Sequence, residues 1–418
     1  MPLQQSLEYY AISLCFDAGF ERSPVENWLF RRFLILAAVS SLAAAWFFGH
    51  FAYDASVERY LTLVFTQAAK FERLSYDASG RSSLFKAVND RDCLIGYVTA
   101  TEGRGYGGPM LVVVGWSGEG SLLTLRVPKH KEDAAWFRLL ENKGFYEQYL
   151  GKKDNDPFEF ARDIDAVSGA TLSSYGVADG VLKARALVAN HLGHTIPARV
   201  RAPVQIALPE ILLLLGLCWV ILLRTFHLFN RTKWRRLPSL VFGFVVLGIW
   251  LGQPLSLVNF TTWLVGYFSP IQANILLYSI LFGVLGTALL LGKNFYCFWL
   301  CPFSAVQEGA HLLTGSTIRP DQACGRKLRG MRYMLLWFAL FLAFLLEAPS
   351  ATIFEPWTAL FTLKGTTAQW FLVGIALVGG MVVHNFWCIF LCPVGAMLEI
   401  VLKMRQWTIG LWKKEGVE

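Results

Sequence analysis

A short stretch of the chain gathers hydroxyl groups in a pattern suited to holding a phosphate. Residues 165–171 read D-A-V-S-G-A-T and precede a Ser-rich segment that is expected to begin a helix. Gly169 allows a tight turn at this point. The hydroxyls of residues 168, 171, 173 and 174 then lie at the helix N-terminus, where backbone N–H groups attract phosphate. Composition alone leaves a second interpretation open, in which these side chains only cap the helix.

A duplicated cysteine box is the second feature with a chemical meaning. Residues 294–308 read N-F-Y-C-F-W-L-C-P-F-S-A-V-Q-E, and residues 385–399 read N-F-W-C-I-F-L-C-P-V-G-A-M-L-E. The two copies match at a constant offset, which pairs Cys297 with Cys388, Cys301 with Cys392, Pro302 with Pro393 and Glu308 with Glu399. The duplication predicts two helix–helix–cysteine units packed about a pseudo-two-fold axis.

The spacing of the cysteines indicates a shared centre. Cysteines at positions i and i+4 of a helix lie on one face, so the four thiols of the two boxes are expected to converge. Thiolates hold iron–sulfur clusters or zinc, and the Pro after the second Cys is expected to end the helix near that ligand. Two alternatives stay open: a zinc site, and reduced thiols that only pack. We favour an iron–sulfur cluster held by Cys297, Cys301, Cys388 and Cys392, with Cys324 as a further candidate ligand.

The stretch at residues 165–171 resembles the flavinylation motif, D-x-x-S-G-A-T, of the FMN-binding domains in Rnf and Nqr ion pumps and in NosR/NirI-type membrane proteins. The fixed positions of that motif match Asp165, Ser168, Gly169, Ala170 and Thr171. The resemblance implies that the Thr171 Oγ carries FMN covalently, through a phosphoester bond. It also implies a separate flavin transferase that attaches the FMN and recognises Asp165.

Two further elements of that family occur earlier in the chain, in the family's order. G-Y-G-G-P is present as Gly105, Tyr106, Gly107, Gly108 and Pro109. From the residues alone, this glycine loop fits either a close approach to a phosphate or aromatic ring, or a plain hairpin loop. The family's H-x-E-T element reads H-K-E-D here, so its Thr is absent. The resemblance implies flavin contacts from the glycine loop and from His130 and Glu132.

The cysteine boxes, read as C-x-x-x-C-P, resemble the membrane part of NosR/NirI proteins and related boxes in NapH-type ferredoxin-like membrane proteins. Phe354-Glu355-Pro356 resembles a further loop element of that family. Full-length family members continue into a C-terminal cytoplasmic domain with ferredoxin-type motifs. This chain has no Cys after Cys392, so we expect any cytoplasmic iron–sulfur input to come from a partner or to be absent.

Composition places much of the chain in a membrane. It has 418 residues, of which 55% are hydrophobic, and a mean hydropathy of +0.43. Its net charge of +8 comes from basic residues beside apolar runs, which follows the positive-inside rule and argues against nucleic-acid binding. The loops expected on the opposite side of the membrane carry almost no Lys or Arg, and Lys364 is the exception. We expect six membrane spans with both chain ends in the cytoplasm: residues 33–51, 211–226, 240–258, 271–291, 333–346 and 370–390.

The long segment between the first two spans is expected to be one α+β domain. We predict strands at 93–100, 110–115 and 121–127, and helices at 134–142 and 173–189. The predicted organisation has three parts: a cytoplasmic N-terminus with the first transmembrane helix (1–51), a periplasmic FMN-binding domain (52–206), and an all-α, five-helix membrane domain with the cysteine boxes on its cytoplasmic side (207–418).

The resulting hypothesis is a multi-pass protein of the bacterial inner membrane, surrounded by lipid, that is an electron-transfer component rather than a stand-alone enzyme. Electrons would pass between a quinone or ferredoxin-like donor and a periplasmic redox acceptor. The flavin and the cluster are expected on opposite faces of the membrane. The ~30 Å between the two faces is too long for one electron-tunnelling step. An intermediate carrier such as a quinone or a partner haem is therefore expected, unless the FMN domain folds onto the membrane. The alternatives are a redox-responsive regulatory or maturation factor for a periplasmic metalloenzyme such as nitrous oxide reductase, and a structural subunit whose motif carries no flavin.

Overall fold

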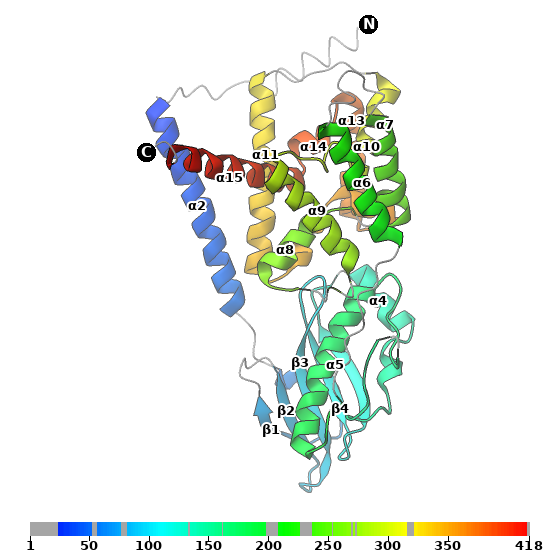
Figure 1. The fold of residues 1–418 in the computed structure, drawn as a ribbon. Helices are drawn as coiled ribbons and strands as arrows, with labels where there is room; N and C mark the ends of the chain where they lie inside the picture. The colour runs from blue at the N-terminus through cyan, green and yellow to red at the C-terminus, as the bar shows by residue number, and fades with distance from the viewer. Residues whose placement is uncertain are drawn as a thin grey trace.

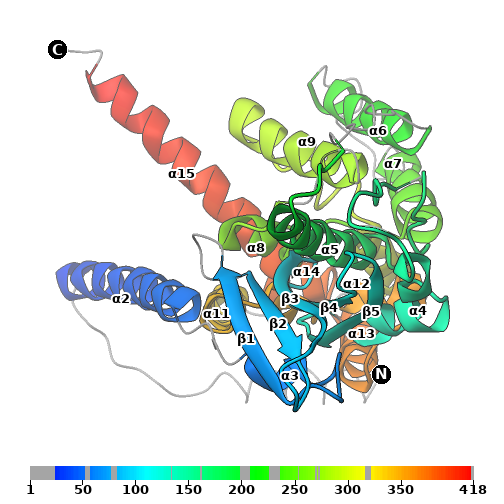
Figure 2. The same ribbon diagram turned by 90° about the horizontal axis from the view of Figure 1, so that it is seen from below.

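A sheet and a bundle of helices lie at opposite ends of the molecule, and the first helix runs beside the bundle (Figure 1). The computed structural model describes residues 24–51, 57–76, 82–132, 134–160, 162–197, 208–225, 236–252, 254–268, 271, 274–315 and 322–415. Seen from below, α2 (Pro24–Phe51) and α15 (Pro393–Glu415) both extend away from the bundle (Figure 2).

The sheet is an antiparallel meander in which each strand pairs with the next along the chain. Its strand β4 (Pro109–Trp116) is buried at every residue. Helix α5 (Thr171–Leu192) covers one face of the sheet, and α3 (Glu58–Leu61) with the segment after it covers the other. A continuous apolar run is the pattern expected of a strand covered on both faces. The five strands are β1 (Lys70–Tyr76), β2 (Ser83–Val88), β3 (Leu94–Arg104), β4 (Pro109–Trp116) and β5 (Leu122–Lys129).

Most of this sheet domain lies where the sequence predicted it. Strands β3, β4 and β5, the helix α4 (Ala134–Asn142) and the helix α5 all fall on predicted elements. Strands β1 and β2 were not predicted. β1 is an edge strand whose residues are largely exposed and polar, so its sequence lacks a clear alternation. β2 is a short apolar run, which periodicity cannot distinguish from part of a helix.

Gly180 sets how closely α5 approaches the sheet. An ideal Cβ placed on Gly180 would lie 2.4 Å from Val112 Cγ2, far inside van der Waals contact. The same close approach lets the Thr101 hydroxyl donate to the Gly180 carbonyl at 2.8 Å. The helix that begins at the hydroxyl-rich stretch is therefore fixed against the centre of the sheet.

Two helices among the described residues are individually long and apolar enough to cross a membrane. They are Arg32–His50 within α2 and Leu328–Leu345 within α11 (Gln322–Leu345). Helices α12 (Pro356–Thr362) and α13 (Thr367–Val382) meet at a bend of 100°. They add a third candidate span if the pair is counted as a single broken helix. The prediction of six spans is thus supported only in part.

The other predicted spans coincide with shorter or broken helices. The run predicted as one span over 240–258 ends as a helix at Trp250, and a new helix begins at Leu257. The last predicted span breaks after Val382. The remaining helical elements are α6 (Leu208–Thr225), α7 (Leu237–Phe242), the π-helix η3 (Gly243–Trp250), α8 (Leu257–Val265), α9 (Ile275–Leu291), α10 (Pro302–Thr314), α14 (Phe386–Phe390) and the 3-10 turns η1 (Tyr146–Tyr149) and η5 (Pro349–Thr352).

Replacement of Gly180 by Ala should destabilise the sheet domain, because the added methyl group has no room beside Val112. We expect the free energy of unfolding to fall by about 1–3 kcal/mol, the usual cost of overpacking. Thermal melting followed by tryptophan fluorescence measures it, since Trp116 is buried in this core. The matched control is Gly374→Ala in α13, where no atom lies within 4 Å of the new methyl group. Equal shifts in the two variants would contradict this account of the packing.

Candidate functional site

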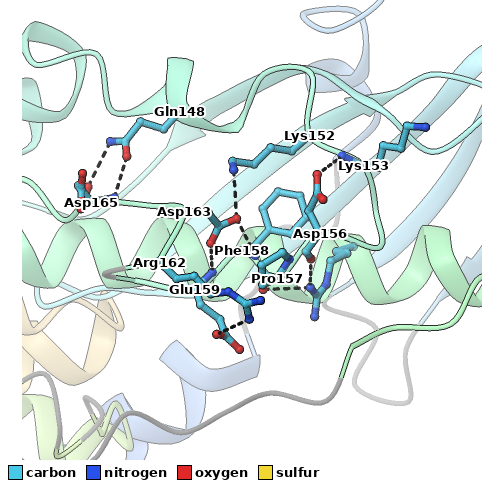
Figure 3. A network of polar contacts seen from close by, with 11 residues as sticks. Gln148, Lys152, Lys153, Asp156, Pro157, Phe158, Glu159, Arg162, Asp163 and Asp165 are labelled. Atoms are coloured by element: carbon cyan, nitrogen blue, oxygen red, sulfur yellow. Dashed lines mark hydrogen bonds and ion pairs between the residues drawn. The ribbon is translucent and has the colours of Figure 1, made fainter.

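The segment that leads into the hydroxyl-rich stretch is held by a network of polar contacts (Figure 3). The Asp163 carboxylate accepts the backbone N–H groups of Phe158 and Glu159 at 3.1 and 2.7 Å. Gln148 fixes the backbone of Asp165 from two sides: its Oε1 accepts the Asp165 N–H at 2.7 Å, and its Nε2 donates to the Asp165 carbonyl at 3.2 Å. The first residue of the motif is therefore held through its backbone, while its side chain is exposed.

The motif itself forms a turn closed by Ser174. The Ser174 hydroxyl accepts the Val167 N–H at 3.1 Å and donates to the Ala170 carbonyl at 3.0 Å. Gly169 has a φ of +86°, the left-handed conformation that glycine adopts without strain. Asp165, Ser168 and Gly169 are all exposed, so a modifying protein can reach the turn.

Thr171 is the first residue of α5 and is half-buried. Its hydroxyl lies 3.4 Å from the Val167 carbonyl, at the long limit of a hydrogen bond. The first-turn N–H groups and the positive end of the helix dipole lie at this side chain, which suits a phosphate. Ser173 and Ser174 instead use their hydroxyls inside the protein. Of these three hydroxyls, that of Thr171 makes the longest hydrogen bond, and α5 has no side-chain cap.

The glycine loop lies directly against α5. An ideal Cβ on Gly176 would lie 2.8 Å from the Gly105 Cα, so this contact requires glycine. Glu132 joins the same two elements: its Oε1 accepts the Gly107 N–H at 2.6 Å, and its Oε2 accepts the Ser173 hydroxyl at 2.5 Å. Two motifs that lie far apart in the sequence therefore meet at the start of one helix.

His130 occupies a different environment from Glu132. Its ring stacks on Phe137 of α4 with the ring centroids 3.7 Å apart. Burial lowers the pKa of His130, so the imidazole is neutral near pH 7. A neutral, stacked ring supplies packing between β5 and α4 rather than a positive charge for a phosphate.

Two side chains beside the motif were not predicted from the sequence. An ideal Cβ on Gly169 would lie 3.7 Å from the Trp136 ring, and Lys364 Nζ lies 4.7 Å from the centre of that ring. An aromatic surface with a cation beside it suits an aromatic group that carries a phosphate. Lys364 stands out in the sequence as a cation in a loop expected to lack them. The sequence gives no indication that it lies near the motif at Thr171.

The glycine loop also makes the contact between the sheet domain and the helices. The Tyr106 hydroxyl donates to Asn259 Oδ1 in α8 at 2.9 Å, and the Ser350 N–H donates to the Gly107 carbonyl at 3.2 Å. Lys131 Nζ donates to the carbonyl of Glu347 at 3.0 Å. Burial raises the pKa of Tyr106, so its phenol keeps the proton that it donates.

The four box cysteines line one cavity of about 180 Å³. In the described part of the chain, no set of three or more His, Cys, Asp or Glu side chains is arranged to hold a single metal ion. Four thiols spread around a cavity are the donor set of cubane iron–sulfur clusters, so the residues present fit such a group. The side chain of Cys324 lies outside the described residues.

Neither box is a continuous helix, and this corrects the prediction from the spacing. In the first box, Asn294 Oδ1 accepts the N–H of Cys297 at 3.0 Å within a turn, and Cys301 is the N-cap of α10. In the second box, Cys388 lies in the short helix α14 and Cys392 directly precedes α15. The prolines begin α10 and α15 rather than end a helix, because the first helical position needs no N–H.

Charged pairs repeat beside the two boxes. Arg236 pairs with Glu308, and Arg332 pairs with Glu399, the glutamates that match in the duplicated sequence. Arg332 and Glu399 both lie in the wall of the cysteine cavity. A guanidinium at this wall lowers the cost of negative charge on thiolates. The repeated pairing supports two structurally related units.

Tyr296 connects the cysteine cavity to the segment that holds the glycine loop. It lines the cavity next to Cys297, and its hydroxyl accepts the Leu255 N–H at 2.8 Å. Leu255 lies four residues before Asn259, the partner of Tyr106, so the Cα atoms of Leu255 and Asn259 are at most about 15 Å apart. The segment from Leu255 to Asn259 therefore contacts both the cysteine cavity and the glycine loop.

Comparison with known families defines the class of protein. Residues 105–186 match the model of an FMN-binding domain, and residues 273–319 and 370–411 match that of a 4Fe-4S binding domain. The first match includes the glycine loop, Glu132 and Thr171, and the second includes all four box cysteines. The chain thus combines an FMN-binding domain built on the sheet with a helical 4Fe-4S binding part.

The matching curated proteins confirm the resemblance to NosR/NirI-type proteins. The regulatory protein NosR of Pseudomonas aeruginosa is 32% identical over 226 residues, which are 48% of this chain and 31% of that protein. The protein NirI of Paracoccus denitrificans is 32% identical over 187 residues, 41% of this chain and 28% of its own. The putative electron transport protein YccM of Escherichia coli is 28% identical over 134 residues, 29% of this chain and 37% of its own. The chain spans about a third of the length of these relatives.

Replacement of Glu132 by Ala should separate the glycine loop from α5, because two hydrogen bonds to one carboxylate are lost. We expect a loss of about 1–3 kcal/mol in the free energy of unfolding of the sheet domain. Thermal melting measures the loss, and limited proteolysis reports whether cleavage appears within residues 104–109. The control is Glu119→Ala, whose side chain is exposed in a hairpin turn. A variant as stable and as resistant to protease as the control would contradict the bridging role.

Proposed function

We propose that the chain is a membrane-bound electron-transfer flavoprotein. Electrons pass between the membrane or cytoplasmic side and a periplasmic redox acceptor, through FMN attached at Thr171 and an iron–sulfur cluster held by Cys297, Cys301, Cys388 and Cys392. When bound, FMN supplies one- and two-electron chemistry and the cluster supplies one-electron chemistry. The inner membrane is the proposed location, with six spans, the sheet domain in the periplasm and a partner donor such as a quinol or a ferredoxin-like protein.

The observation that carries this proposal is the short connection between the two sites. Tyr106 of the glycine loop contacts Asn259, and Leu255 of the same segment contacts Tyr296 at the cysteine cavity. Asn259 is buried, so its contact with Tyr106 is largely shielded from solvent. A domain held in this position keeps the Thr171 side of the molecule at a constant distance from the cysteines, as electron transfer requires.

A covalent flavin fits the surroundings of Thr171. The motif turn is exposed, so a flavin held only by noncovalent contacts with it would exchange with the solvent. The half-buried Thr171 hydroxyl has only a long hydrogen bond to give up when a phosphoester forms. Attachment by a flavin transferase at this residue therefore costs the protein little of its own structure.

A regulatory role is the second candidate function, and the name of the NosR relative favours it. In that role the redox state of the two sites would act as a signal to a system that matures a periplasmic metalloenzyme. The rate of flavin reduction by membrane donors distinguishes the two roles. If the protein is a carrier, its flavin is reduced at least as fast as the respiratory chain turns over. Flavin reduction many times slower than that turnover supports a sensor.

Thr171→Val should remove the covalent flavin, because valine has the shape of threonine without the nucleophilic oxygen. We expect the intact mass of the chain, produced together with a flavin transferase, to exceed the mass of the polypeptide by one FMN. The increment should be absent in Thr171→Val and present in Thr62→Val, an exposed threonine outside the motif. No increment in the unchanged chain would overturn the covalent assignment.

Cys301→Ala and Cys392→Ala should each abolish the iron–sulfur centre, since each removes one of four thiols at the cavity. Anaerobically purified protein should contain about four iron atoms per chain and absorb broadly near 400 nm, as is typical of a cubane cluster. The control is Cys218→Ala, because Cys218 is exposed on α6. Unchanged iron content in both cavity variants would contradict the assignment of these cysteines as ligands.

A further inference from the structure

A short loop of the helical part reaches the sheet domain beside the motif at Thr171. Residues 363–366 connect α12 to α13, and Lys364 in this loop places its Nζ 4.7 Å from the centre of the Trp136 ring. Trp136 belongs to α4, which lies at the end of the sheet domain nearest to the helical part (Figure 1). The surroundings of the motif are therefore built from both parts of the chain.

The backbone on both sides of Lys364 is anchored. The Thr362 Oγ1, at the end of α12, accepts the Lys364 N–H at 3.3 Å. Thr366 starts α13 with a capping box: its hydroxyl accepts the Gln369 N–H at 3.3 Å, and its own N–H donates to Gln369 Oε1 at 2.8 Å. The loop thus presents the Lys364 side chain from a fixed position rather than from a long, free segment.

Lys364 is also a cation without an acidic partner. In the segment that leads into the motif, Lys152 pairs with Asp163 at 3.0 Å, and Arg162 pairs with Glu159 at 3.5 Å. Among the residues that the structure describes, no carboxylate forms an ion pair with Lys364. The charge of Lys364 is therefore the one at this aromatic surface that no neighbouring carboxylate offsets.

The surface beside Lys364 suits the ring of a flavin rather than its phosphate. An ideal Cβ on Gly169 would lie 3.6 Å from Leu139 Cδ1 and 3.7 Å from the Trp136 ring. Gly169 precedes Thr171 by two residues, so their Cα atoms are at most about 7 Å apart. A phosphate attached at Thr171 stays at the helix N-terminus, whereas an aliphatic and an aromatic side chain favour a flat ring. Lys364 is thus placed at the ring end of the flavin.

A cation at the ring end acts mainly on the reduced flavin. Reduction by two electrons and one proton leaves one negative charge on the ring, while the oxidised ring is neutral. A fixed positive charge nearby stabilises the anionic form and has little effect on the neutral one. Because the Lys364 side chain is exposed, solvent and salt screen part of this interaction.

We propose that Lys364 sets the potential of the flavin at Thr171, with Trp136 supporting the ring and the Lys364 ammonium stabilising its reduced, anionic form. The helical part thereby supplies a flavin contact from outside the FMN-binding domain. The flavin accepts electrons more readily when the sheet domain is docked against the α12–α13 loop than it would without this contact. This inference rests on the proposed function, because it requires FMN at Thr171.

A redox titration of the full chain tests the proposal. The protein is produced with a flavin transferase and titrated anaerobically with dithionite against a reference dye. The structured visible bands of oxidised flavin distinguish it from the broad absorption of a cluster. In Lys364→Met, the ratio of reduced to oxidised flavin at a fixed potential should fall by about tenfold, which is about 30 mV for a two-electron couple. Lys364→Arg keeps the charge and should titrate as the unchanged chain does.

Two further measurements separate the charge effect from a structural one. Arg91→Met removes an exposed cation from the β2–β3 hairpin, at the opposite end of β3 from the glycine loop, and should leave the potential unchanged. The difference between Lys364→Met and the unchanged chain should shrink in about 1 M salt, where the Debye length is about 3 Å. Trp136→Leu should increase the fluorescence of the oxidised flavin, because an indole in contact with the ring quenches it.

The outcomes distinguish this inference from the proposed function. Equal potentials in Lys364→Met and the unchanged chain, with the full FMN mass and unchanged melting temperatures, would overturn the inference alone. A shift that Lys364→Arg shares, or that salt does not reduce, would overturn it too, because the charge would then not be its cause. If the unchanged chain gains no FMN mass, the proposed function fails and the inference fails with it.

Discussion

The Glu132 carboxylate accepts two hydrogen bonds that join the glycine loop to the start of α5. Every other feature of the flavin side depends on this junction. On one side of it, α5 begins at Thr171 and presents its N-terminus to a phosphate. On the other side, the loop places Tyr106 and Gly107 against the helical part. This half-buried carboxylate therefore links the start of α5 to the loop that contacts the helical part.

The cysteine cavity depends on a different constraint, the duplication of the chain. Each unit supplies two thiols and a glutamate paired with an arginine, and neither unit alone encloses the cavity. Arg332 precedes the second box in the chain and lines the same cavity as Cys297 of the first box, so the two units interlock. This site is therefore built from residues of both units, whereas the sheet domain has a core of its own.

The sequence predicted the chemistry of this chain better than its geometry. The motif at Thr171 and the cysteine boxes were found because both depend on residue type and spacing, and the strands from β3 to β5 because their apolar runs are strong. The helix assumed for the boxes was wrong, because Asn294 and the prolines impose turns and helix starts that a spacing rule does not contain. Trp136, Lys364 and Asn259 were missed because each acts through a contact with a residue far away in the sequence, and no local pattern records such a contact.

The break after Trp250 shows how the helical part gains its connection to the sheet domain. The break leaves backbone N–H groups at the start of α8 that have no partner within a helix, and buried N–H groups need partners. Glu355, which has no exposed surface, accepts the Leu257 N–H at 3.0 Å and the Ser256 hydroxyl. Pro356 then begins α12 directly after it. The loop element Phe354-Glu355-Pro356 thus fixes the first turn of α8, with Leu255 held at Tyr296 on one side and Asn259 held at Tyr106 on the other. One buried carboxylate thus stabilises the start of the helix whose segment contacts both the cysteine cavity and the glycine loop.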